Sequence, residues 1–408
     1  MTRLTRAAAI LAAGAAALPA LAQETPVTFT RGERNTDFAP AFEQQFRAPL
    51  AETVGTSTET LAGGLVHPWG IAALPGGGYL VTERAGRLRH LAADGTLSEP
   101  LSGVPEVASV EQGGLLDVQL GPDFAEDRMV YLTYAKPMGE NDAGEALYAT
   151  AAARGTLSED LSGLEGAEDI FVQQQPSTAP MHFGSRIVFP GDGTAFITTG
   201  EHFTEYYRDF AQDLGKTYGK VIRVNLDGSI PEDNPFAGQD GADSAIWSYG
   251  HRNIQSAVID DAGTLWTVEH GPKGGDELNR PEPGLNYGWP VISYGEQYSD
   301  APVGSGEAAM EGMEQPIYFW DPVIAPSGMA IHAGEKFGDW NGDVLIGSLY
   351  PGGVVRLSLD EEGLVTEEER LLRDVGRVRD VEVLEDGSLI ILTDFENGSV
   401  IRVTPAEG

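Results

Sequence analysis

The sequence predicts an all-β protein folded as a six-bladed β-propeller of four-stranded antiparallel blades. The first observation is a short recurring pattern: a turn with glycine or a charged residue, then a segment rich in β-branched and aromatic side chains. Such segments are strands by propensity and by their bounding turns. Its six copies begin at Gly78, Arg128, Gly193, Gly263, Gly342 and Gly387.

The second observation is that several copies are followed by another strand-like segment. Units of about 40 to 50 residues that each hold a small antiparallel sheet are typical of β-propellers. A parallel α/β fold would need helical periods between its strands, and the one helix-compatible segment, about 146–163, is short and weakly periodic. Asp-Gly pairs fit the expected hairpin turns. The strands that follow these copies are expected at 87–91, 221–224, 354–357 and 400–403.

The two ends of the propeller segment differ from the repeats. Residues 1–22 are expected to be a cleavable signal peptide, because Arg3 and Arg6 precede an apolar run and Ala20-Leu21-Ala22 resembles a cleavage site. Residues 23–60 are interpreted as an N-terminal arm and 61–408 as a single catalytic propeller domain. The expected location is the periplasm. No later apolar stretch approaches the length of roughly 18 residues that suggests a membrane span.

Composition limits the classes of partner and of chemistry. The chain has no cysteine, so disulfide frameworks and thiolate metal sites are excluded. Its net charge of -36 disfavours nucleic acid and anionic membranes as natural partners. Dinucleotide-binding, phosphate-loop, HExxH and GxSxG motifs are missing from the sequence. With only 26 lysines and arginines, any cluster of arginine needs a local reason.

The segment from Ile246 to Pro290 is the strongest site candidate, because it carries polar groups on turn-forming, glycine-rich backbone. Arg252 and Asn253 suit a planar, carboxylated ligand, since guanidinium matches carboxylate bidentately. Asp276, Glu277 and nearby turn carbonyls are hard oxygen ligands, which indicate calcium. The alternative for these acids is a solvated loop in an acidic protein.

Three shorter segments are further candidates. Gln112 stands before a pair of glycines that would let the backbone approach a ligand. His182 lies in a loop ahead of a strand, where it is either a general base or a structural histidine. Arg377 and Arg379, at i and i+2 of a strand, face the same side and indicate an anionic ligand. The alternative for this arginine pair is a surface strand.

Together these segments resemble the soluble quinoprotein sugar dehydrogenases, specifically the PQQ-dependent aldose sugar dehydrogenase group. The resemblance covers roughly residues 60 to 405, with the motifs in the family's order. These motifs are HPWGIAALPGGGYLVTERAGRL, QGGLLDVQLGPDFAEDRMVYLTYA, HFGSRIVFPGDGTAFITTGE, AQDLGKTYGKVIRVNLDGSIPEDNPF, the segment 246–290, FWDPVIAPSGM and RVRDVEVLEDGSLIILTD.

The resemblance implies a propeller that binds pyrroloquinoline quinone (PQQ) and Ca²⁺ and oxidises aldoses to lactones. His182 matches the general base that takes the proton from the sugar's anomeric hydroxyl. Calcium next to the cofactor would be held by the backbone carbonyls of Gly271 and Pro272. Glu277 and Tyr287 match ligands of a second, structural calcium. The cofactor contacts implied by the family are Gln112, Arg252, Asn253, Tyr298, Arg377 and Arg379.

Two other functions stay open from the sequence. One is a calcium-dependent hydrolase, such as a lactonase, which would leave Arg377 and Arg379 without a clear role. The other is a propeller that binds a sugar or a partner without catalysis, a possibility raised by departures from the family at Met181 and Tyr350. The preferred sugar, the external electron acceptor and the oligomeric state are not determined by the sequence.

Overall fold

The computed structural model describes residues 29–406 of the chain. The chain divides into two units, at residues 1–31 and 32–408. Of the first unit only residues 29–31 are described, and they form no helix or strand. The expected signal peptide lies outside the described residues. Everything below concerns the second unit.

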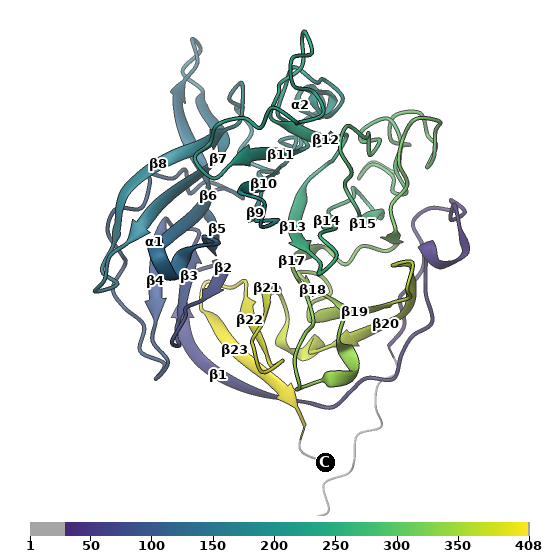
Figure 1. Ribbon diagram of the computed structural model, residues 1–408. Helices are drawn as coiled ribbons and strands as arrows, with labels where there is room; N and C mark the ends of the chain where they lie inside the picture. The colour runs from purple at the N-terminus through teal and green to yellow at the C-terminus, as the bar shows by residue number, and fades with distance from the viewer. Residues whose placement is uncertain (1–28, 407–408) are drawn as a thin grey trace, which may run out of the picture. The chain divides into compact units, whose positions relative to one another are not determined.

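Residues 32–406 form six antiparallel sheets arranged in a ring around a central channel (Figure 1). Five of these sheets have four strands and one has three, so the six-bladed β-propeller is confirmed. The three-stranded blade is extended by one antiparallel bridge between Leu91 and Leu97. The described helices are short turns: α1 (Phe124–Asp127), α2 (Glu205–Arg208), and the 3-10 turns Glu43–Gln45, Asp209–Ala211, Gly338–Trp340 and Arg373–Val375.

The blades follow one another along the chain. Blade 1 contains β2 (Pro68–Ala73), β3 (Tyr79–Glu83) and β4 (Arg87–Leu91). Blade 2 contains β5 (Leu115–Leu120), β6 (Met129–Glu140), β7 (Ala146–Leu157) and β8 (Leu164–Val172). Blade 3 contains β9 (Gly184–Val188), β10 (Thr194–Thr199), β11 (Lys220–Asn225) and β12 (Ile246–Tyr249).

The remaining blades complete the ring. Blade 4 contains β13 (Ile254–Ile259), β14 (Leu265–Glu269), β15 (Asp276–Asn279) and β16 (Tyr318–Trp320). Blade 5 contains β17 (Pro326–Ile331), β18 (Val344–Ser348), β19 (Val354–Leu359) and β20 (Val365–Leu371). Blade 6 contains β21 (Val378–Val383), β22 (Leu389–Thr393), β23 (Gly398–Pro405) and β1 (Thr56–Leu65).

Blade 6 is built from distant parts of the sequence. Its outermost strand, β1, pairs antiparallel with β23, with Thr58 opposite Val403. In Figure 1 these two strands, purple and yellow, lie side by side. Pairing between the first and the last strand closes the ring, and it hydrogen-bonds an edge of β23 that would otherwise be open.

The first strand of each blade lines the central channel, because β2, β5, β9, β13, β17 and β21 contact one another around the ring. All six run in the same direction, so their amino-terminal ends meet at one mouth of the channel. The second strand of each blade is antiparallel to the first and therefore ends at that same mouth. Residues just before a first strand and just after a second strand are thus brought together.

The segment 146–163 is not helical. Residues 146–157 form β7, which pairs with β6 and β8 in the middle of blade 2. Ala151 and Ala153 pack into the apolar cluster on one side of the blade, and Ala152 packs into the cluster on the other side. The alanines that favour a helix locally are here small side chains between two packed layers, so tertiary packing overrides propensity.

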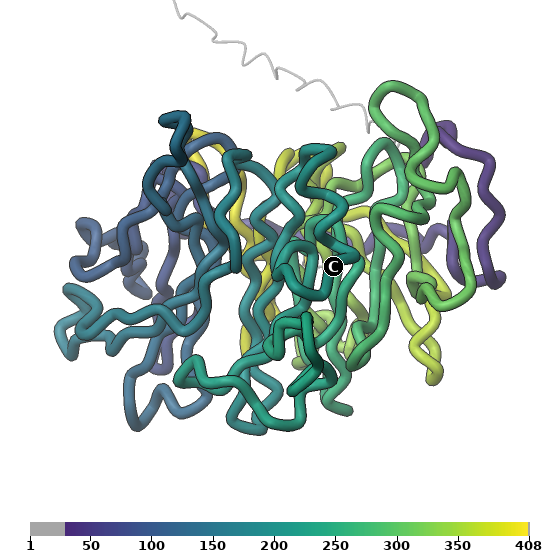
Figure 2. The backbone as a smooth tube through the Cα atoms, turned by 90° about the horizontal axis from the view of Figure 1, so that it is seen from above, coloured from purple at the N-terminus to yellow at the C-terminus, as the bar shows by residue number. Residues whose placement is uncertain are grey.

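Residues 32–55 form an arm that runs along blade 4. Asp321 accepts hydrogen bonds from the backbone N–H groups of Asn35 and Thr36, each at 2.9 Å. Phe46 stacks on Phe319 with ring centroids 4.5 Å apart. Figure 2 shows this purple arm next to the green segments of blade 4. The arm brings Asn35 to the rim of the channel mouth.

No helix within residues 29–406 is long and apolar enough to cross a membrane.

Candidate active site

Two connected cavities open at the mouth where the first strands begin. One has a volume of about 520 Å³ and the other of about 270 Å³. Both are lined by Gln112 and His270. The larger cavity brings together the predicted residues Gln112, His182, Arg252, Gly271, Pro272 and Tyr298. The smaller brings together the predicted residues Gln112, Asn253, Arg377 and Arg379.

His182 precedes β9 and is held in place by its neighbours. Its backbone N–H donates to Oε1 of Gln112 at 2.9 Å. Its ring Nδ1 lies 3.3 Å from Oε1 of Glu201, a buried residue that follows β10. The Phe203 ring packs edge-on against the imidazole, with centroids 5.1 Å apart. The loop before β5 and the loop after β10 therefore position this histidine.

The charges around His182 determine its tautomer. Burial alone would raise the pKa of Glu201, but His182 and Arg252 lower it below its ordinary value, so the carboxylate is ionised. Burial, helped by Arg252, lowers the pKa of His182 despite the opposing effect of Glu201, so the imidazole is neutral at pH 7. An ionised carboxylate can only accept, so Nδ1 carries the hydrogen and Nε2 carries the free lone pair. His182 is thereby prepared to act as a base through Nε2.

The backbone of His182 adopts an uncommon conformation. Its φ is +48°, in the left-handed region that L residues avoid. A Cβ at Gly200 would lie 1.9 Å from the carbonyl oxygen of His182, so only glycine fits at that position. Strained backbone of this kind persists where surrounding structure fixes it, and it is concentrated at functional sites.

Arg252 and Asn253 stand immediately before β13 and are buried. Nη1 of Arg252 donates to the carbonyl oxygens of His270 at 3.0 Å and Gly271 at 2.7 Å. Its Nε is buried without a hydrogen-bond partner among the described residues. Oδ1 of Asn253 accepts from the N–H of Gly184 at 3.1 Å. Nε of Arg252 lies 4.0 Å from Oε1 of Glu201, and the Asn253 carbonyl fixes the loop after His182.

His270, which follows β14, is a neutral hydrogen-bonding group of the site. Its Nε2 donates to the carbonyl oxygen of Pro326 at 2.7 Å. Burial, together with the nearby Arg252 and His182, lowers its pKa to about 3. Its Nδ1 therefore accepts, and it lies 3.5 Å from Nδ2 of Asn253.

The turn that carries Gly271 and Pro272 is fixed by Asp276. Oδ1 of Asp276 accepts from the N–H of Gly271 at 2.8 Å. Oδ2 accepts from the N–H groups of Ile324 at 2.8 Å and Ala325 at 2.7 Å. Although burial raises the pKa of Asp276 to about 7, these bonds oppose the rise. Asp276, which the sequence offered as a direct oxygen ligand, instead holds the turn carbonyls at the cavity.

Glu277 and Tyr287 do not line either cavity. The Tyr287 hydroxyl donates to the carbonyl of Arg280 at 2.6 Å, and its ring stacks on His251. Burial and the neighbouring Glu269 raise the pKa of Glu277 well above its usual range. Within residues 29–406, no group of three or more His, Asp and Glu side chains is arranged to hold a metal ion.

Arg377 and Arg379 both point to Asp394, which follows β22. Each arginine donates through Nη2 to Oδ2 of Asp394 at 2.7 Å. Burial alone would raise the pKa of Asp394. The charge of Arg379 and the hydrogen bonds from His67, Arg377 and Arg379 instead lower this pKa far below its ordinary value. Nε of Arg379 is buried without a described partner. One carboxylate thus holds two guanidinium groups at the cavity, and one of them retains an unused donor.

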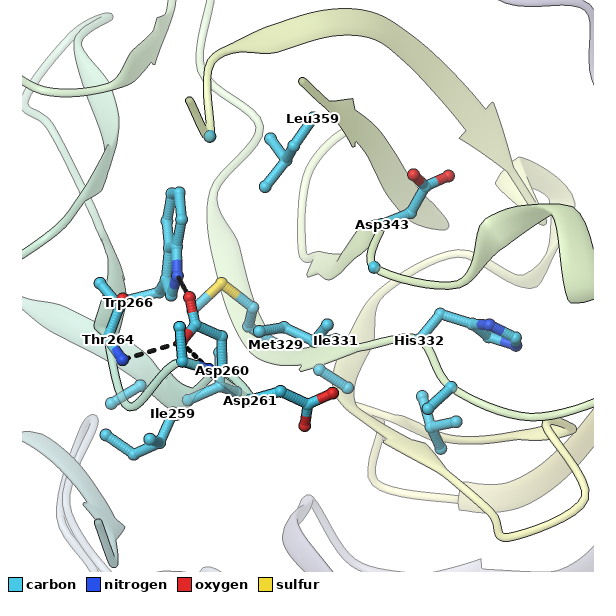
Figure 3. A pocket seen from close by; sticks show the side chains of 18 of the residues that line it. Ile259, Asp260, Asp261, Thr264, Trp266, Met329, Ile331, His332, Asp343 and Leu359 are labelled. Atoms are coloured by element: carbon cyan, nitrogen blue, oxygen red, sulfur yellow. Dashed lines mark hydrogen bonds between the residues drawn. The ribbon is translucent and has the colours of Figure 1, made fainter. Parts of the chain in front are cut away.

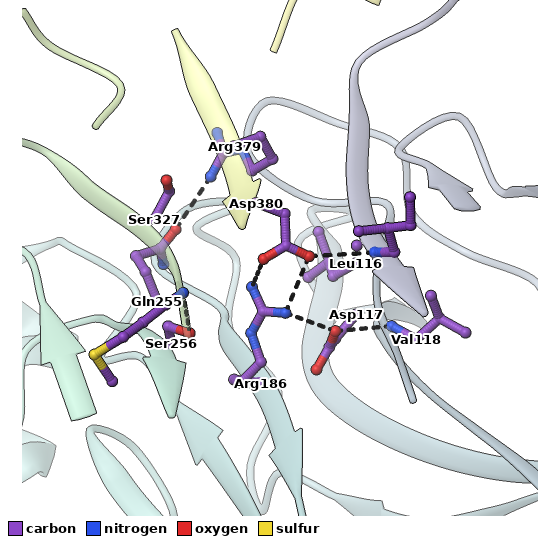
Figure 4. A network of polar contacts seen from close by, with 12 residues as sticks. Leu116, Asp117, Val118, Arg186, Gln255, Ser256, Ser327, Arg379 and Asp380 are labelled. Carbon is purple, nitrogen blue, oxygen red and sulfur yellow. Dashed lines mark hydrogen bonds and ion pairs between the residues drawn. The ribbon is translucent and has the colours of Figure 1, made fainter. Parts of the chain in front are cut away.

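Deeper in the channel, below these arginines, lies a network of buried ion pairs (Figure 4). Arg186 donates to Asp117 at 2.8 Å and to Asp380 at 3.1 Å. Arg186 is also stacked over Trp69, 4.8 Å from the ring centroid. Asp380 directly follows Arg379 along β21, so the network separates the mouth described above from the opposite end of the channel.

A larger cavity of about 870 Å³ opens at that opposite end (Figure 3). Two of its polar side chains are engaged in nearby turns: Asp260 accepts from Trp266 and Thr264, and His332 donates to the carbonyl oxygen of Gly387. Asp343 pairs with Arg356. Its volume exceeds that of the other two cavities, but its histidine and these two acids serve the structure of the turns. The predicted site residues lie at the other mouth.

Sequence reasoning missed several residues of the site, namely Arg84, Glu201, His270 and Asp394. All four directly follow, or lie within two residues of, the end of a second strand: β3, β10, β14 and β22. The recurring strand pattern, combined with antiparallel pairing, could have located them at the mouth. Gly114, the second glycine after Gln112, also has another role than expected. It approaches the backbone of Arg84, and a Cβ at Gly114 would lie 2.0 Å from the carbonyl oxygen of Arg84.

Comparison with known proteins places this geometry in a family. Residues 65–402 match the glucose/sorbosone dehydrogenase family. Aldose sugar dehydrogenase YliI of Escherichia coli strain K12 is 44% identical over 354 residues, which cover 86% of this chain and 93% of the relative. Quinoprotein glucose dehydrogenase B of Acinetobacter calcoaceticus is 26% identical over 387 residues, covering 77% and 80%.

Solved structures agree with the sequence relatives. The apo form of the soluble aldose sugar dehydrogenase from Escherichia coli superposes with a TM-score of 0.81 at 42% identity, covering 86% of this chain and all of that one. The PQQ-bound aldose sugar dehydrogenase from Streptomyces coelicolor gives a TM-score of 0.69 at 28% identity with the same coverage. The resemblance indicated by the sequence motifs is confirmed. The chain belongs to the glucose/sorbosone dehydrogenase family.

Proposed function

We propose that the protein is a periplasmic oxidoreductase that converts aldose sugars to lactones by oxidation at the anomeric carbon, with PQQ and Ca²⁺ as cofactors. The observation that carries the proposal is the neutral His182, oriented by Glu201, at the rim of a cavity that continues to Arg377 and Arg379. The mouth thus combines a general base with binding groups for a polyanion. The family relationship supports the same reaction.

His182 is proposed to take the proton of the sugar's anomeric hydroxyl on Nε2. Its Nδ1–H stays bonded to Glu201, which fixes the ring and stabilises the imidazolium that forms. Phe203 and Tyr298 at the rim, with rings 6.4 Å apart, would offer apolar faces to the sugar. When bound, PQQ would accept the hydride from the anomeric carbon, and Ca²⁺ would act as a Lewis acid on the quinone.

The residues present fit a planar tricarboxylate. The buried Nε atoms of Arg252 and Arg379 form no hydrogen bond within the described residues, and Nε of Arg252 lies 4.0 Å from Oε1 of Glu201. Asn253 and Gln112 line the smaller cavity. Arg377 and Arg379 would bind carboxylates of PQQ, since guanidinium pairs with carboxylate bidentately. The PQQ-bound structure of the Streptomyces coelicolor relative supports this choice of cofactor.

The donor set also fits calcium at the cofactor. The carbonyl of Gly271 already accepts from the cationic Arg252, and Pro272 lines the same cavity. These two carbonyls would hold Ca²⁺, which prefers oxygen ligands. Glu277, buried beside Glu269, and the backbone at Tyr287 are proposed for a second, structural Ca²⁺, because a divalent cation would offset two adjacent carboxylates.

A reconstitution assay tests the proposal. Purified apoprotein is mixed with PQQ, CaCl₂ or both, and reduction of an artificial dye is followed with a panel of aldoses. The dye replaces the external electron acceptor, which we expect to be a separate molecule. We expect turnover only when both cofactors are present. Lactone hydrolysis with calcium and without quinone would instead establish the hydrolase reading, and absence of PQQ binding would refute the proposal.

A further inference from the structure

Arg84 occupies a position at the smaller cavity that neither the sequence motifs nor the family relationship assigns. It directly follows β3 and lines the cavity together with Arg377 and Arg379. Its backbone is fixed on both sides, because its N–H donates to His67 O at 3.1 Å and its carbonyl accepts from Leu115 N at 3.2 Å. Nη2 donates to the carbonyl of Glu111 at 2.7 Å. The guanidinium is therefore held at the cavity wall.

The side chain of Arg84 has an unused donor. Its Nε is buried without a hydrogen-bond partner among the described residues. Unsatisfied buried donors are rare in folded proteins and call for an explanation. Nε of Arg379, which lines the same cavity, has the same status. Arg84 of blade 1 and Arg379 of blade 6 thus line one cavity, and the buried Nε of each forms no hydrogen bond within the described residues.

The charge of this cavity is strongly positive. Its described lining contains three arginines and no acidic side chain. Asp394, just behind the lining, is bonded to two of these arginines and to His67. Burial is the main cause that lowers the pKa of Arg84, and Arg379 and Arg377 lower it further, while Asp394 raises it. In a chain of net charge -36, this local excess of cations fits a polyanionic ligand.

We propose that Arg84 is a third guanidinium contact for the carboxylates of the cofactor, acting with Arg377 and Arg379. The inference rests on the proposed PQQ-dependent function and adds a residue that determines cofactor affinity. PQQ carries three carboxylates, and the cavity offers three arginines. Arg84 lies on the opposite side of the blade 1–blade 6 junction from the other two, so the three can bind separate parts of one planar ligand.

A structural role is the competing explanation, because Arg84 also ties the loop at Glu111 to β3. The two roles differ in their dependence on the ligand's charge. Loss of a structural contact to the loop would weaken the binding of any ligand of the same shape. Loss of a carboxylate contact would weaken binding only when the carboxylate is charged. The trimethyl ester of PQQ keeps the ring system and removes the three charges, so it separates the two explanations.

The experiment measures the equilibrium dissociation constants of PQQ and of its trimethyl ester, by quenching of tryptophan fluorescence in the presence of CaCl₂. Arg84→Gln is compared with the wild type and with Arg402→Gln. Arg402 pairs with Asp386 on the outer part of blade 6, so its substitution makes the same change in net charge away from the cavity. Arg84→Lys keeps the charge without the fork of donors, and it serves if the glutamine variant does not fold.

For Arg84→Gln we expect PQQ binding to weaken by about 10- to 100-fold, the range for a charge-assisted hydrogen bond. Arg84→Lys is expected to lose less affinity for PQQ than Arg84→Gln. Arg402→Gln should bind PQQ as the wild type does, and the ester should bind to the wild type and to Arg84→Gln with equal affinity. Equal losses for PQQ and ester, or PQQ binding within about twofold of wild type, would overturn the inference and leave the cofactor assignment intact. A wild type that binds no PQQ would refute both.

Discussion

Arg186 and Asp380 face each other across the central channel, where Nη2 of the arginine donates to Oδ1 of the aspartate at 3.1 Å. This contact joins β9 of blade 3 to β21 of blade 6, and Nη1 of Arg186 adds Asp117 of blade 2 at 2.8 Å (Figure 4). Burial raises the pKa of both carboxylates, that of Asp117 to about 6, and Arg186 opposes the rise in each. One buried cation therefore connects three inner strands.

Replacing Arg186 with methionine should strongly destabilise the fold. The change leaves two buried carboxylates without their cation, and we expect the free energy of unfolding to fall by about 3 to 5 kcal/mol. Urea unfolding followed by circular dichroism measures the loss. Arg154→Met is the matched control, because Arg154 pairs at the surface with Glu168, whose side chain is 60% exposed, and should cost about 0 to 1 kcal/mol. Equal losses in the two variants would contradict the role assigned to Arg186.

Replacing His182 with alanine should remove catalysis and leave the cofactor bound. General-base help is worth about 100- to 10,000-fold, so we expect kcat to fall by that factor. The dissociation constant of PQQ should stay near that of the wild type, since the arginine-lined cavity is unchanged. Stopped-flow reduction of the bound quinone and fluorescence titration measure the two quantities. His90→Ala, on β4 outside both cavities, is the control. Full turnover in His182→Ala would refute the general-base role.

The pH dependence of turnover should reflect the depressed pKa of His182. Burial is the main cause that lowers it below 6.5. Because the reaction needs the neutral imidazole, kcat should rise as the pH increases through the folded pKa and be constant above it. We therefore expect the midpoint of the acidic limb of the kcat profile to lie below pH 6.5. A midpoint above pH 7 would show that the charged form of His182 is favoured in the enzyme.

Glu201→Gln should separate positioning from proton acceptance. The Glu201 carboxylate raises the pKa of His182, so its removal should move the acidic limb to lower pH. The plateau should fall at the same time, because the imidazolium loses its counter-charge, but by less than the roughly 100- to 10,000-fold that the base as a whole contributes. The measurement is the pH profile of kcat beside that of the wild type. A lower plateau with an unmoved limb would indicate a packing defect instead.

Asp276→Ala should release the turn that presents Gly271 and Pro272. Three backbone N–H groups would lose their acceptor, at a cost of about 1 to 3 kcal/mol each if they stay buried. We expect a lower melting temperature and weaker stabilisation by added CaCl₂, measured by calorimetry. Asp227→Ala is the control, because its carboxylate accepts from Ser229 in an exposed turn. If calcium stabilised Asp276→Ala as much as the wild type, these carbonyls would not be its ligands.

The architecture was largely predictable because local signals and global fold agree in most blades. The strand expected at 87–91 has the same bounds as β4, and Gly-bounded, β-branched segments became second strands in each blade. The order of the motifs also predicted that His182, Arg252 and Arg379 belong to one site, and the structure places all three at one mouth of the channel. The segment from Ala146, which is compatible with a helix by propensity alone, forms strand β7, because its small side chains pack between two apolar layers whose residues come from distant parts of the chain.

The partners of the predicted residues were harder to find. Glu201 orients His182 from 19 positions away, and Asp394 holds Arg379 from 15 positions away. Both follow a second strand, so their neighbourhood depends on how antiparallel strands return to the channel mouth. Arg84 reaches its cavity in the same way. Residue types alone do not distinguish such side chains from the many acids and bases on the surface. The pairing of the strands is needed to identify them.

The pairing of β1 with β23 also sets an order of assembly. Blade 6 draws its outer strand from residues 56–65 and its other strands from residues 378–405, so it is complete only after nearly the whole chain has been synthesised. That same blade supplies Arg377, Arg379 and Asp394. The arginine-lined pocket therefore comes into existence as the ring closes, and an anionic cofactor has no binding place on a partly folded chain. If the protein binds PQQ as proposed, the cofactor would bind only after the ring has closed.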